Sequence, residues 1–567
     1  MGSLLGAAND FAGVFGAADP ASALRPLGVA PAWHDAEVAF GGAPVWVDPT
    51  DSLVVVGDVW LDAPHRLRAT LGLPDAAPPA LLAELYRRHG ASLGRHAAGM
   101  LAVAIWDPQR RRLVLLRDAV GARTLYYAQQ GRTWWFAARL RTLRRAPAVS
   151  DELNLAALRD YLIYSYVPGS RTLWRDAVEL RPGTALVLPG GGTHPYWEPA
   201  ESEWDPAEPI EAHAARLRTL LEDAVRLRLP PAESVGVFLS GGLDSSLITA
   251  LAARMHQGQA VHTYAIHFGA QYPNELAFSS LVAEHCGTRH HVLELPARRI
   301  VEALPETLEA LDNPIGDPLT VPNLLLGRTA AQDTRVILNG EGGDPCFGGP
   351  KNQPLLLHDL YAPPGGREAA YLRAHAKCYD DLPELLTPAA QRALSLEEPP
   401  EALVTPYLED PRMPHFLNKL MYLNVRLKGA DHILTKVNNL TSAVGLLGHS
   451  PLFDQRVVEL SFAIPPVFKV EGANEKAVLK RAVADLLPPS ILARPKSGMM
   501  VPVQRWFKGE LRRYAADMLL GRRALTRPYL NERTVRDWLA FQGQLWPRHG
   551  VKLWLLLTLE VWLRVQR

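Results

Sequence analysis

Short apolar runs separated by turns dominate the first 200 residues of the chain. Their length and alternation are typical of β-strands that bury at least one face. The runs include Leu53–Val56, Met100–Trp106, Arg112–Arg117 and Thr133–Ala138. From about residue 206, apolar runs of strand length alternate with segments of helical spacing, as in an open parallel sheet covered by helices. The pattern therefore predicts two domains, residues 1–200 and 206–567.

A strand, a turn and a helix stand near the start of the second domain. Val235–Leu239 has the apolar character of a buried parallel strand, and Leu247–Met255 continues with a helical pattern. The turn between them is an expected anion site, because its glycines let the backbone approach closely and its hydroxyls donate hydrogen bonds. The helix N-terminus adds free N–H groups. The expected ligands are Ser240, Gly241, Gly242, Asp244, Ser245 and Ser246.

The acidic residue in this turn decides which anion is expected. Asp244 would repel a phosphate unless a metal ion lay between them. The turn also lacks the Gly-x-x-x-x-Gly-Lys-Ser/Thr pattern of loops that bind a γ-phosphate. The arrangement favours Mg²⁺-bound pyrophosphate leaving an ATP molecule whose α-phosphate is attacked.

The composition of the chain indicates which kinds of partner are disfavoured and in which cellular compartment the protein is expected. A formal net charge of +1 over 567 residues argues against nucleic acid as a partner. Three cysteines without metal-ligand spacing fit a reducing compartment, and no signal segment precedes the first domain, so we expect a cytoplasmic protein. Val551–Val565 is apolar but interrupted by charges, which predicts a docked C-terminal helix and no membrane span.

The six residues Ser240–Ser245 resemble the pyrophosphate loop of the asparagine synthetase family. The resemblance implies an α+β, Ntn-amidotransferase-like β-sandwich over residues 1–200, here a degenerate class II glutamine amidotransferase domain. It implies an α/β ATP-pyrophosphatase domain, of the adenine nucleotide α-hydrolase-like type, over residues 206–567. ATP and Mg²⁺ are the implied cofactors, and ATP should lie across the carboxyl ends of the strands.

Two later segments resemble further motifs of this family. Val336–Gly349 is an apolar strand that runs into a glycine-rich loop. The resemblance implies that Gly340 binds the nucleotide and that Glu341 is catalytic. It also implies that Asp344 faces Asp244, so that two carboxylates hold the Mg²⁺. Arg494-Pro-Lys496 resembles a late motif, which implies a catalytic lysine at the α-phosphate, where a fixed cation stabilises the transition state.

The chemistry of the amidotransferase domain is missing from the sequence. Ala12 stands where the family has its cysteine nucleophile, and an alanine offers no thiolate. Val56 replaces the asparagine that helps to hold the oxyanion, and Ala98 replaces the aspartate that binds the glutamine amine. We therefore expect a scaffold domain that does not deliver ammonia from glutamine.

The sequence predicts that the amine comes from the substrate itself, which gives an intramolecular ring closure. Two related families with an inactive amidotransferase domain suggest alternatives, a lasso-peptide cyclase and a β-lactam synthetase. Glu341 and Asn439 replace a tyrosine and a glutamate of the β-lactam enzymes, which favours the lasso cyclase. The roughly seventy residues between Gly349 and Lys419 could wall a wide cavity. An ammonia-dependent asparagine synthetase and a non-catalytic homologue stay open.

The lasso-cyclase hypothesis also predicts a substrate and a partner protein. It predicts a precursor peptide as substrate, with a macrolactam between its N-terminal amine and an Asp or Glu side chain, and a leader peptidase as partner protein.

One further feature of the sequence is the pair His290-His291. No third ligand follows at helical or hairpin spacing, so we interpret this pair as packing residues rather than as a metal site.

Overall fold

The computed structural model describes residues 10–361, 366–375, 377–472, 474–495, 498–542 and 549–566. The chain forms two compact units that exchange segments. Unit 1 comprises Met1–Asn154, Gly169–Pro199 and Gly429–Asn438; unit 2 comprises Leu155–Pro168, Ala200–Lys428 and Asn439–Arg567. The predicted domain limits at residues 200 and 206 stay a prediction.

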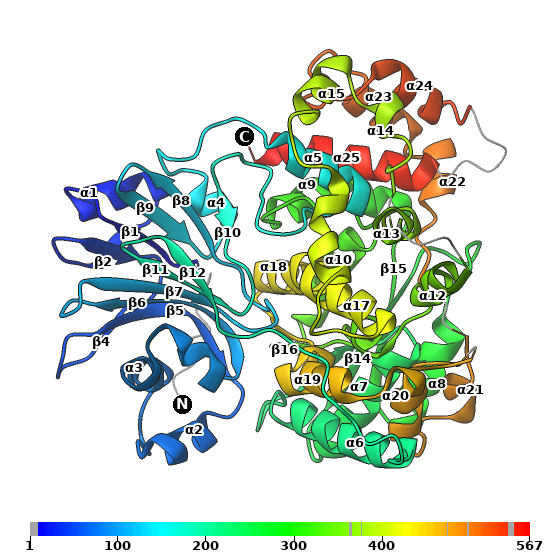
Figure 1. Ribbon diagram of the computed structural model, residues 1–567. Helices are drawn as coiled ribbons and strands as arrows, with labels where there is room; N and C mark the ends of the chain where they lie inside the picture. The colour runs from blue at the N-terminus through cyan, green and yellow to red at the C-terminus, as the bar shows by residue number, and fades with distance from the viewer. Residues whose placement is uncertain are drawn as a thin grey trace. The chain divides into compact units, whose positions relative to one another are not determined.

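Unit 1 is built on two antiparallel sheets of six strands each (Figure 1). The first sheet has the order β10 (Val178–Glu179), β8 (Tyr126–Gln130), β9 (Thr133–Ala137), β1 (Ala12–Phe15), β3 (Val38–Gly41) and β2 (Pro31–His34). The second has the order β12 (Gly192–Pro195), β11 (Thr184–Leu188), β7 (Arg112–Arg117), β6 (Gly99–Asp107), β5 (Val54–Leu61) and β4 (Trp46–Val47). A shared apolar core with residues from both sheets makes this a β-sandwich.

The strand pattern of the sequence is confirmed in unit 1. The four predicted runs fall on β5, β6, β7 and β9. All of β6 from Met100 to Asp107 is buried, because its sheet is covered on one side by the other sheet and packs α3 (Pro78–His89) on β5 (Figure 1). A strand with two covered faces needs an uninterrupted apolar run, which is what the sequence shows.

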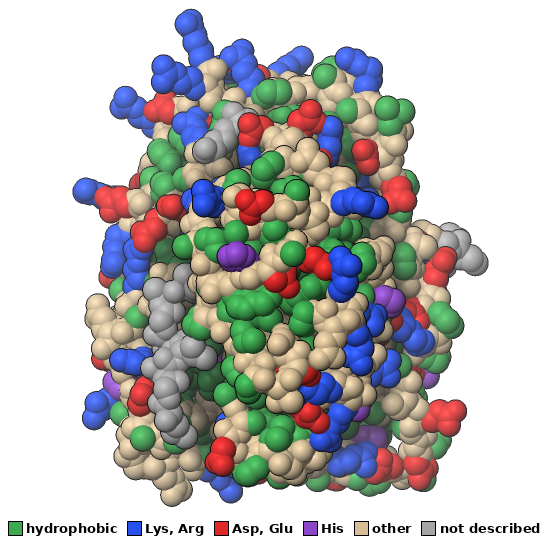
Figure 2. All heavy atoms as spheres, turned by 90° about the vertical axis from the view of Figure 1, so that its left-hand side faces the viewer, with side chains coloured by type: hydrophobic (Ala, Val, Ile, Leu, Met, Phe, Trp, Pro, Cys, Tyr) green, Lys and Arg blue, Asp and Glu red, His purple; other side chains and the backbone are tan. Residues whose placement is uncertain are grey.

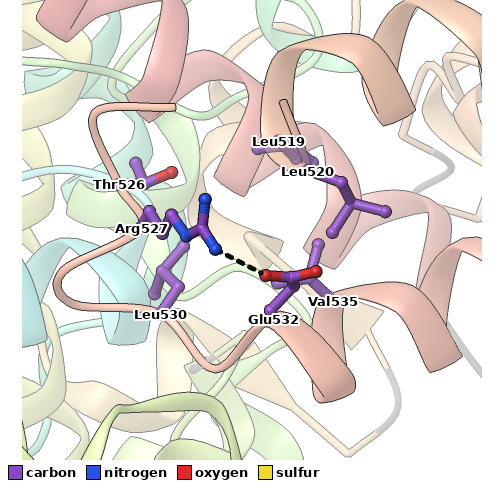
Figure 3. A pocket seen from close by; sticks show the side chains of 7 residues that line it. All are labelled: Leu519, Leu520, Thr526, Arg527, Leu530, Glu532 and Val535. Atoms are coloured by element: carbon purple, nitrogen blue, oxygen red, sulfur yellow. Dashed lines mark ion pairs between the residues drawn. The ribbon is translucent and has the colours of Figure 1, made fainter. Parts of the chain in front are cut away.

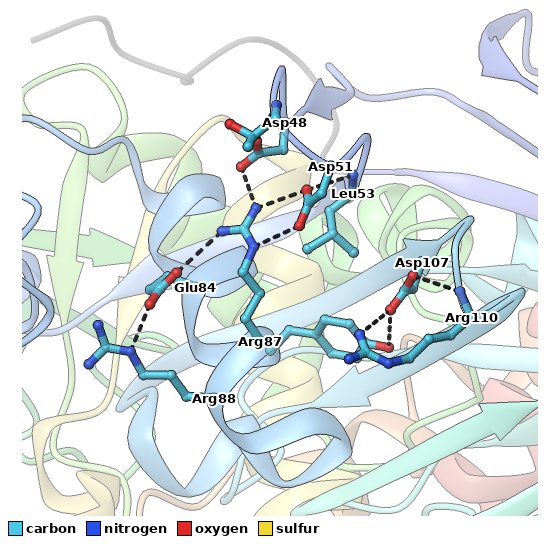
Figure 4. Close-up of polar contacts among 10 residues, drawn as sticks. Asp48, Asp51, Leu53, Glu84, Arg87, Arg88, Asp107 and Arg110 are labelled. Atoms are coloured by element: carbon cyan, nitrogen blue, oxygen red, sulfur yellow. Dashed lines mark hydrogen bonds and ion pairs between the residues drawn. The ribbon is translucent and has the colours of Figure 1, made fainter.

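Arg87 fastens α3 to the turn between β4 and β5 (Figure 4). Its guanidinium lies 2.6 Å from Asp48 Oδ2 and 2.8 Å from Asp51 Oδ2, and it also contacts Glu84 one turn earlier in α3. The hydrogen bond from Arg87 lowers the pKa of Asp51 below its ordinary value. A planar guanidinium that pairs with two carboxylates of this turn fixes the position of the helix better than a single ion pair would.

The centre of unit 2 is a parallel sheet of five strands. Its order is β15 (Arg289–Glu294), β14 (Val261–His267), β13 (Val235–Phe238), β16 (Val336–Leu338) and β17 (Leu447–His449). The chain starts in the middle with β13, adds β14 and β15 on one side, and then returns to add β16 and β17 on the other. Ligands of such sheets bind at the carboxyl ends of the strands, where the order reverses. Here that point lies between β13 and β16.

Helices cover the sheet and complete unit 2 (Figure 1). Those used below are α5 (Leu155–Tyr164), α7 (Leu243–Met255), α8 (Leu276–His285), α11 (Gly343–Phe347), α12 (Asn352–Tyr361), α20 (Ala477–Ala482), α23 (Arg512–Leu519), α24 (Glu532–Leu539) and α25 (His549–Val565). The docked C-terminal helix is confirmed, because α25 is buried along most of its length. Within the ranges that the structure describes, no helix combines the length and the apolar character that crossing a membrane requires.

Each exchanged segment is bound into the unit that receives it. In unit 2, Tyr161 of α5 donates its hydroxyl hydrogen to Leu555 O at 2.8 Å, and Lys377 N donates to Ile163 O at 2.8 Å. In unit 1, the carboxylate of Asp431 accepts from Gly169 N and from Arg181, each at 2.8 Å. The exchanged segments are therefore integral parts of the units that they join.

Candidate functional site

The turn from β13 into α7 has the form of an anion-binding loop. Ser240 and Ser245 close it, since their Oγ atoms lie 3.1 Å apart and Ser240 N donates to Ser245 Oγ at 3.2 Å. Gly242 is the N-cap residue of α7 and has an extended backbone, so the first N–H groups of the helix are directed at the loop. Ser240 and Ser245 thus stand at the end of the strand next to the reversal point.

Gly241 determines the backbone conformation of this loop, and its carbonyl group binds the guanidinium of Arg494. Its φ of +75° is left-handed, and a Cβ atom there would lie 2.5 Å from Ser279 N of α8. Its carbonyl accepts a hydrogen bond from Arg494 at 3.1 Å. Arg494 also pairs with Glu275 and lies over the ring of Phe278, 3.9 Å from its centroid. The Arg-Pro segment of the sequence motif is therefore anchored on the loop.

The glycine-rich loop after β16 lies against the loop after β13. A Cβ atom on Gly343 would come within 2.1 Å of Asp244 Oδ1, and one on Gly340 would lie 2.4 Å from Ser245 N. Neither distance leaves room for a side chain. The glycines thus allow the two loops to approach each other closely, which places Asp344, the second residue of α11, beside Asp244 of α7.

Lys476 connects the two carboxylates. Its Nζ atom donates to Asp244 Oδ1 at 2.9 Å and Oδ2 at 2.6 Å, and lies 2.5 Å from Asp344 Oδ1. The lysine side chain is 2% exposed and that of Asp244 11%, whereas that of Asp344 is 36% exposed. The two aspartates predicted to face each other are thus brought together, and a buried ammonium that the sequence analysis did not identify holds them.

A short hairpin carries Lys476 into the site. Its strands are β18 (Val470–Glu471) and β19 (Asn474–Glu475), and Lys476 follows as the N-cap residue of α20 with a left-handed φ of +54°. At the base of the hairpin, Lys469 is completely buried, and its ammonium donates to Asn418 Oδ1 at 2.6 Å. Ala477 N donates to Lys469 O, which ties the two ends of the hairpin together. No glycine or proline signal marks Lys476 in the sequence.

Several charged groups lie near Lys428. Burial lowers the pKa of Lys428, and nearby Lys351 lowers it further, while the carboxylates of Asp344, Glu341 and Asp317 act in the opposite direction. Glu341 is half-buried, and its backbone N–H donates to Asn339 Oδ1 at 3.0 Å. The carboxylate of Asp344 is therefore one of the groups that favour the charged form of Lys428.

The other predicted site residues have different positions. Lys496, the predicted catalytic lysine, lies outside the described residues. Ser246 is completely buried in α7, so its hydroxyl is not presented at the open face of the loop. Cys346 is also completely buried, and burial raises the pKa of its thiol to about 12, which leaves it protonated and inert near neutral pH.

The amidotransferase positions of unit 1 are apolar. Ala12 is completely buried in β1, and Val56 of β5 belongs to the apolar core of the sandwich. Ala98 is exposed just before β6. All three cysteines of the sequence, Cys286, Cys346 and Cys378, belong to unit 2. No thiol of unit 1 can therefore serve as a nucleophile.

Two other features of the described surface are candidates for an alternative functional site, and neither has the groups that such a site needs. A small pocket (Figure 3) is lined by residues of α23, α24 and the segment between them, mostly aliphatic around the Arg527–Glu532 ion pair. Groups suited to acid–base or nucleophilic chemistry do not converge among its lining residues. On the face seen in Figure 2, basic and acidic side chains are interspersed, in line with the net charge of +1.

Two protein families match different parts of this chain. The family described as "Asparagine synthase" matches residues 216–564, and the "Glutamine amidotransferase domain" family matches residues 79–197, beyond Ala12 and Val56. The asparagine synthetase [glutamine-hydrolyzing] 1 of Bacillus subtilis is 24% identical over 93% of this chain and 87% of its own length.

Further similarities are of the same kind. A putative asparagine synthetase [glutamine-hydrolyzing] of Mycobacterium tuberculosis is 29% identical over 82% of this chain and 77% of its own length. Among solved structures, the glutamine phosphoribosylpyrophosphate amidotransferase of Bacillus subtilis has 12% identity and a TM-score of 0.25, over 50% of this chain and 65% of that one. The chain belongs to the asparagine synthase family of ATP-dependent, amide-forming enzymes.

Proposed function

We propose that this protein closes a macrolactam in a peptide, by activating an Asp or Glu side chain as an acyl-adenylate and joining it to the N-terminal amine of the same peptide. The observation that carries the proposal is an asymmetry between the units. In unit 2, Asp244, Lys476 and Asp344 form a connected polar site at the reversal point of the sheet. In unit 1, alanine and valine occupy the positions of the amidotransferase chemistry.

The loop after β13 is suited to the pyrophosphate that leaves ATP. Ser240 and Ser245 offer hydroxyl groups, and α7 offers its free N–H groups and the positive end of its dipole. Asp244 and Asp344 would hold Mg²⁺, because their oxygens already converge on one cation, the ammonium of Lys476. When bound there, Mg²⁺ neutralises the charge of the phosphates.

Lys476 is the group that we assign to the developing negative charge. In the first step, an oxygen of the substrate carboxylate attacks the α-phosphorus of ATP, and pyrophosphate leaves. In the second step, the amine attacks the acyl carbon, AMP leaves and the amine loses a proton. Both steps build negative charge beside the phosphate, where a fixed, desolvated ammonium stabilises the transition state. The catalytic role that we predict for Lys496 stays a prediction, because this lysine lies outside the described residues.

The source of the amine follows from unit 1. Without a thiol in this unit, glutamine cannot be hydrolysed by the cysteine chemistry of class II amidotransferases. A substrate that carries both groups needs no second nucleophile to bind, and ring closure gains from the proximity of amine and acyl-adenylate. Incubation with glutamine should therefore release no glutamate above background, and steady release would contradict this part of the proposal.

Helix α12 supports a peptide as the substrate. It begins three residues after Gly349, the last glycine of the loop that holds Asp344. Leu357, Leu360 and Tyr361 share one face of α12 by their spacing, and they are 57%, 72% and 81% exposed. Large apolar groups on one exposed helix face are typical of a binding surface. A peptide offers apolar side chains to such a surface, whereas a small amino acid does not extend to it.

A β-lactam synthetase activity is the second candidate, and the residues disfavour it. Glu341 stands in place of the tyrosine of those enzymes. Asn439 stands in place of their glutamate, is completely buried, and carries no acid–base group. The tyrosine and the glutamate expected of a β-lactam synthetase are therefore both absent from these two positions.

Mass spectrometry of a reaction mixture tests the proposal. The mixture contains the protein, ATP, Mg²⁺ and a precursor peptide whose leader has been removed by a peptidase, our proposed partner protein. We expect the core peptide to lose one water while AMP and pyrophosphate form in equal amounts. Loss of water only from small amino acids would support β-lactam chemistry, and incorporation of added ammonium would support an ammonia-dependent asparagine synthetase.

A further inference from the structure

A cluster of two histidines and an aspartate lies at the amino ends of the parallel strands of unit 2. His262 is the second residue of β14, His291 is the third residue of β15, and Asp333 precedes β16. The anion-binding loops leave the opposite, carboxyl ends of these strands. The cluster therefore belongs to a different edge of the sheet from the site described above.

The three ligand atoms form a compact triangle. His262 Nδ1 and His291 Nε2 lie 3.0 Å apart, and Asp333 Oδ2 lies 3.9 Å from the first and 3.8 Å from the second. A point equidistant from these three atoms lies about 2.1 Å from each, which is the usual distance from zinc to imidazole nitrogen and carboxylate oxygen.

Neighbouring residues hold the triangle in place. The hydroxyl of Tyr264 donates to Asp333 Oδ2 at 3.0 Å, and its ring is stacked on that of His291 with centroids 4.9 Å apart. Tyr264 reaches Asp333 across β13 because residue 236 there is a glycine, where a Cβ atom would lie 3.1 Å from the tyrosine ring. Hydrogen bonds of this kind orient the ligands of metal sites.

We propose that His262, His291 and Asp333 form a binding site for one zinc-type divalent transition-metal ion. Two imidazoles and one carboxylate suit Zn²⁺ and its neighbours in the first transition series, whereas Mg²⁺ and Ca²⁺ prefer oxygen ligands only. The side chains of His291 and Asp333 are 36% and 32% exposed, so that water can complete the coordination. The bound ion links β14, β15 and the turn before β16.

Under this proposal, His291 is a metal ligand and only His290 of the His290-His291 pair keeps its interpretation as a packing residue. The sequence offered no further ligand at helical or hairpin spacing, but the parallel sheet supplies His262 and Asp333 from other elements. His290 points to the opposite face of β15, where its Nδ1 atom lies 2.9 Å from Thr263 Oγ1. It provides a matched control, since it is a histidine on the same strand with no place in the triangle.

Zinc titration of the full-length, metal-free protein in excess Mg²⁺ tests the site. We expect one tight equivalent of Zn²⁺ in the wild type and in His290→Ala. His291→Ala and Asp333→Asn should each weaken this equivalent by about 100-fold or more, and Tyr264→Phe by about 10-fold. Equal zinc affinity in His291→Ala, or loss of the equivalent in His290→Ala alone, would overturn the proposal.

Cobalt(II) gives a measurement that does not depend on how the variants fold. Bound to wild type, it should show the visible absorption of a four- or five-coordinate site with nitrogen ligands, and added Zn²⁺ should abolish this absorption at one equivalent. A spectrum of six-coordinate, aqueous cobalt(II) would contradict the proposal. ATP should leave the spectrum unchanged, because the nucleotide loops lie at the other edge of the sheet.

Discussion

Lys476 pairs with Asp244 and Asp344 in the structure. In our proposal its ammonium also stabilises charge on the phosphate during the reaction. Lys476→Met should lower the rate of ATP–pyrophosphate exchange, measured with peptide present, by about 100-fold or more, the effect of losing one preorganised electrostatic donor. The affinity for MgATP should change much less.

Lys480 provides the control for this prediction. It lies one turn later in the same short helix and forms an exposed contact with Asn474, so Lys480→Met removes a lysine without touching the two carboxylates. The rate of ATP–pyrophosphate exchange by the Lys480→Met variant should remain close to that of the wild type. A fully active Lys476→Met variant would show that the buried ammonium is structural and that the catalytic cation lies elsewhere.

The sequence predicts those site residues that lie within a recognisable local motif. Asp244 and Asp344 follow strands within recognisable glycine-rich loops, and the structure brings them together. Lys476 comes more than 130 residues after Asp344, on a hairpin with no motif and with a left-handed backbone that lysine rarely adopts. Only the folding of unit 2 makes Lys476 a neighbour of the carboxylates, so residue patterns did not identify it.

Helix α12 is the element that we connect with peptide binding. Leu360→Glu would place a charge in the middle of its exposed apolar face and should raise the KM for the core peptide at least tenfold. ATP hydrolysis or exchange at saturating peptide should change little, because the anion-binding loops are untouched. Leu396 is 90% exposed elsewhere in unit 2, and Leu396→Glu is the matched control. Equal effects of both substitutions would argue against α12 as the binding face.

The hairpin that carries Lys476 gives the fold a pH dependence. Burial lowers the pKa of Lys469 at its base to about 7, whereas an unfolded lysine titrates near 10.4. Between these pH values the unfolded chain binds a proton that the folded protein does not. The free energy of unfolding should therefore rise with pH in this interval, by up to about 1.4 kcal/mol per pH unit.

Denaturation curves at pH 7, 8 and 9 measure this contribution. Lys469→Met removes the titrating group, and the difference in stability between wild type and variant should shift in favour of the wild type as the pH rises. Below about pH 7 this difference should become constant, because both states of the wild type then bind the proton. A pH-independent difference would show that Lys469 keeps its charge when buried.

Elements were easier to predict than the contacts among them. The apolar runs of unit 1 and the strand, turn and helix around Gly242 were found in place, because burial on one or two faces leaves a direct trace in the sequence. The cluster of His262, His291 and Asp333 left no such trace. These three residues come from β14, β15 and the turn before β16, and the strand order brings them together.

At the scale of the whole molecule, the exchanged segments govern how the chain can be divided. A fragment beginning at residue 206 lacks α5, whose Tyr161 and Ile163 are bonded within unit 2. We expect this fragment to be insoluble or to unfold without a cooperative transition. Co-expression with residues 1–205 as a separate chain should restore a soluble complex. A soluble, active fragment 206–567 on its own would contradict this expectation.

The same chain path bears on how such a gene can evolve. A module that has lost its activity is normally removable by one deletion, provided that it occupies one end of the gene and folds by itself. Here a deletion that removes unit 1 also takes Leu155–Pro168 from unit 2 and leaves Gly429–Asn438 without the residues that bind it. We therefore expect that the need to fold unit 2 would by itself keep the amidotransferase-like unit in the gene, whether or not that unit has catalytic activity.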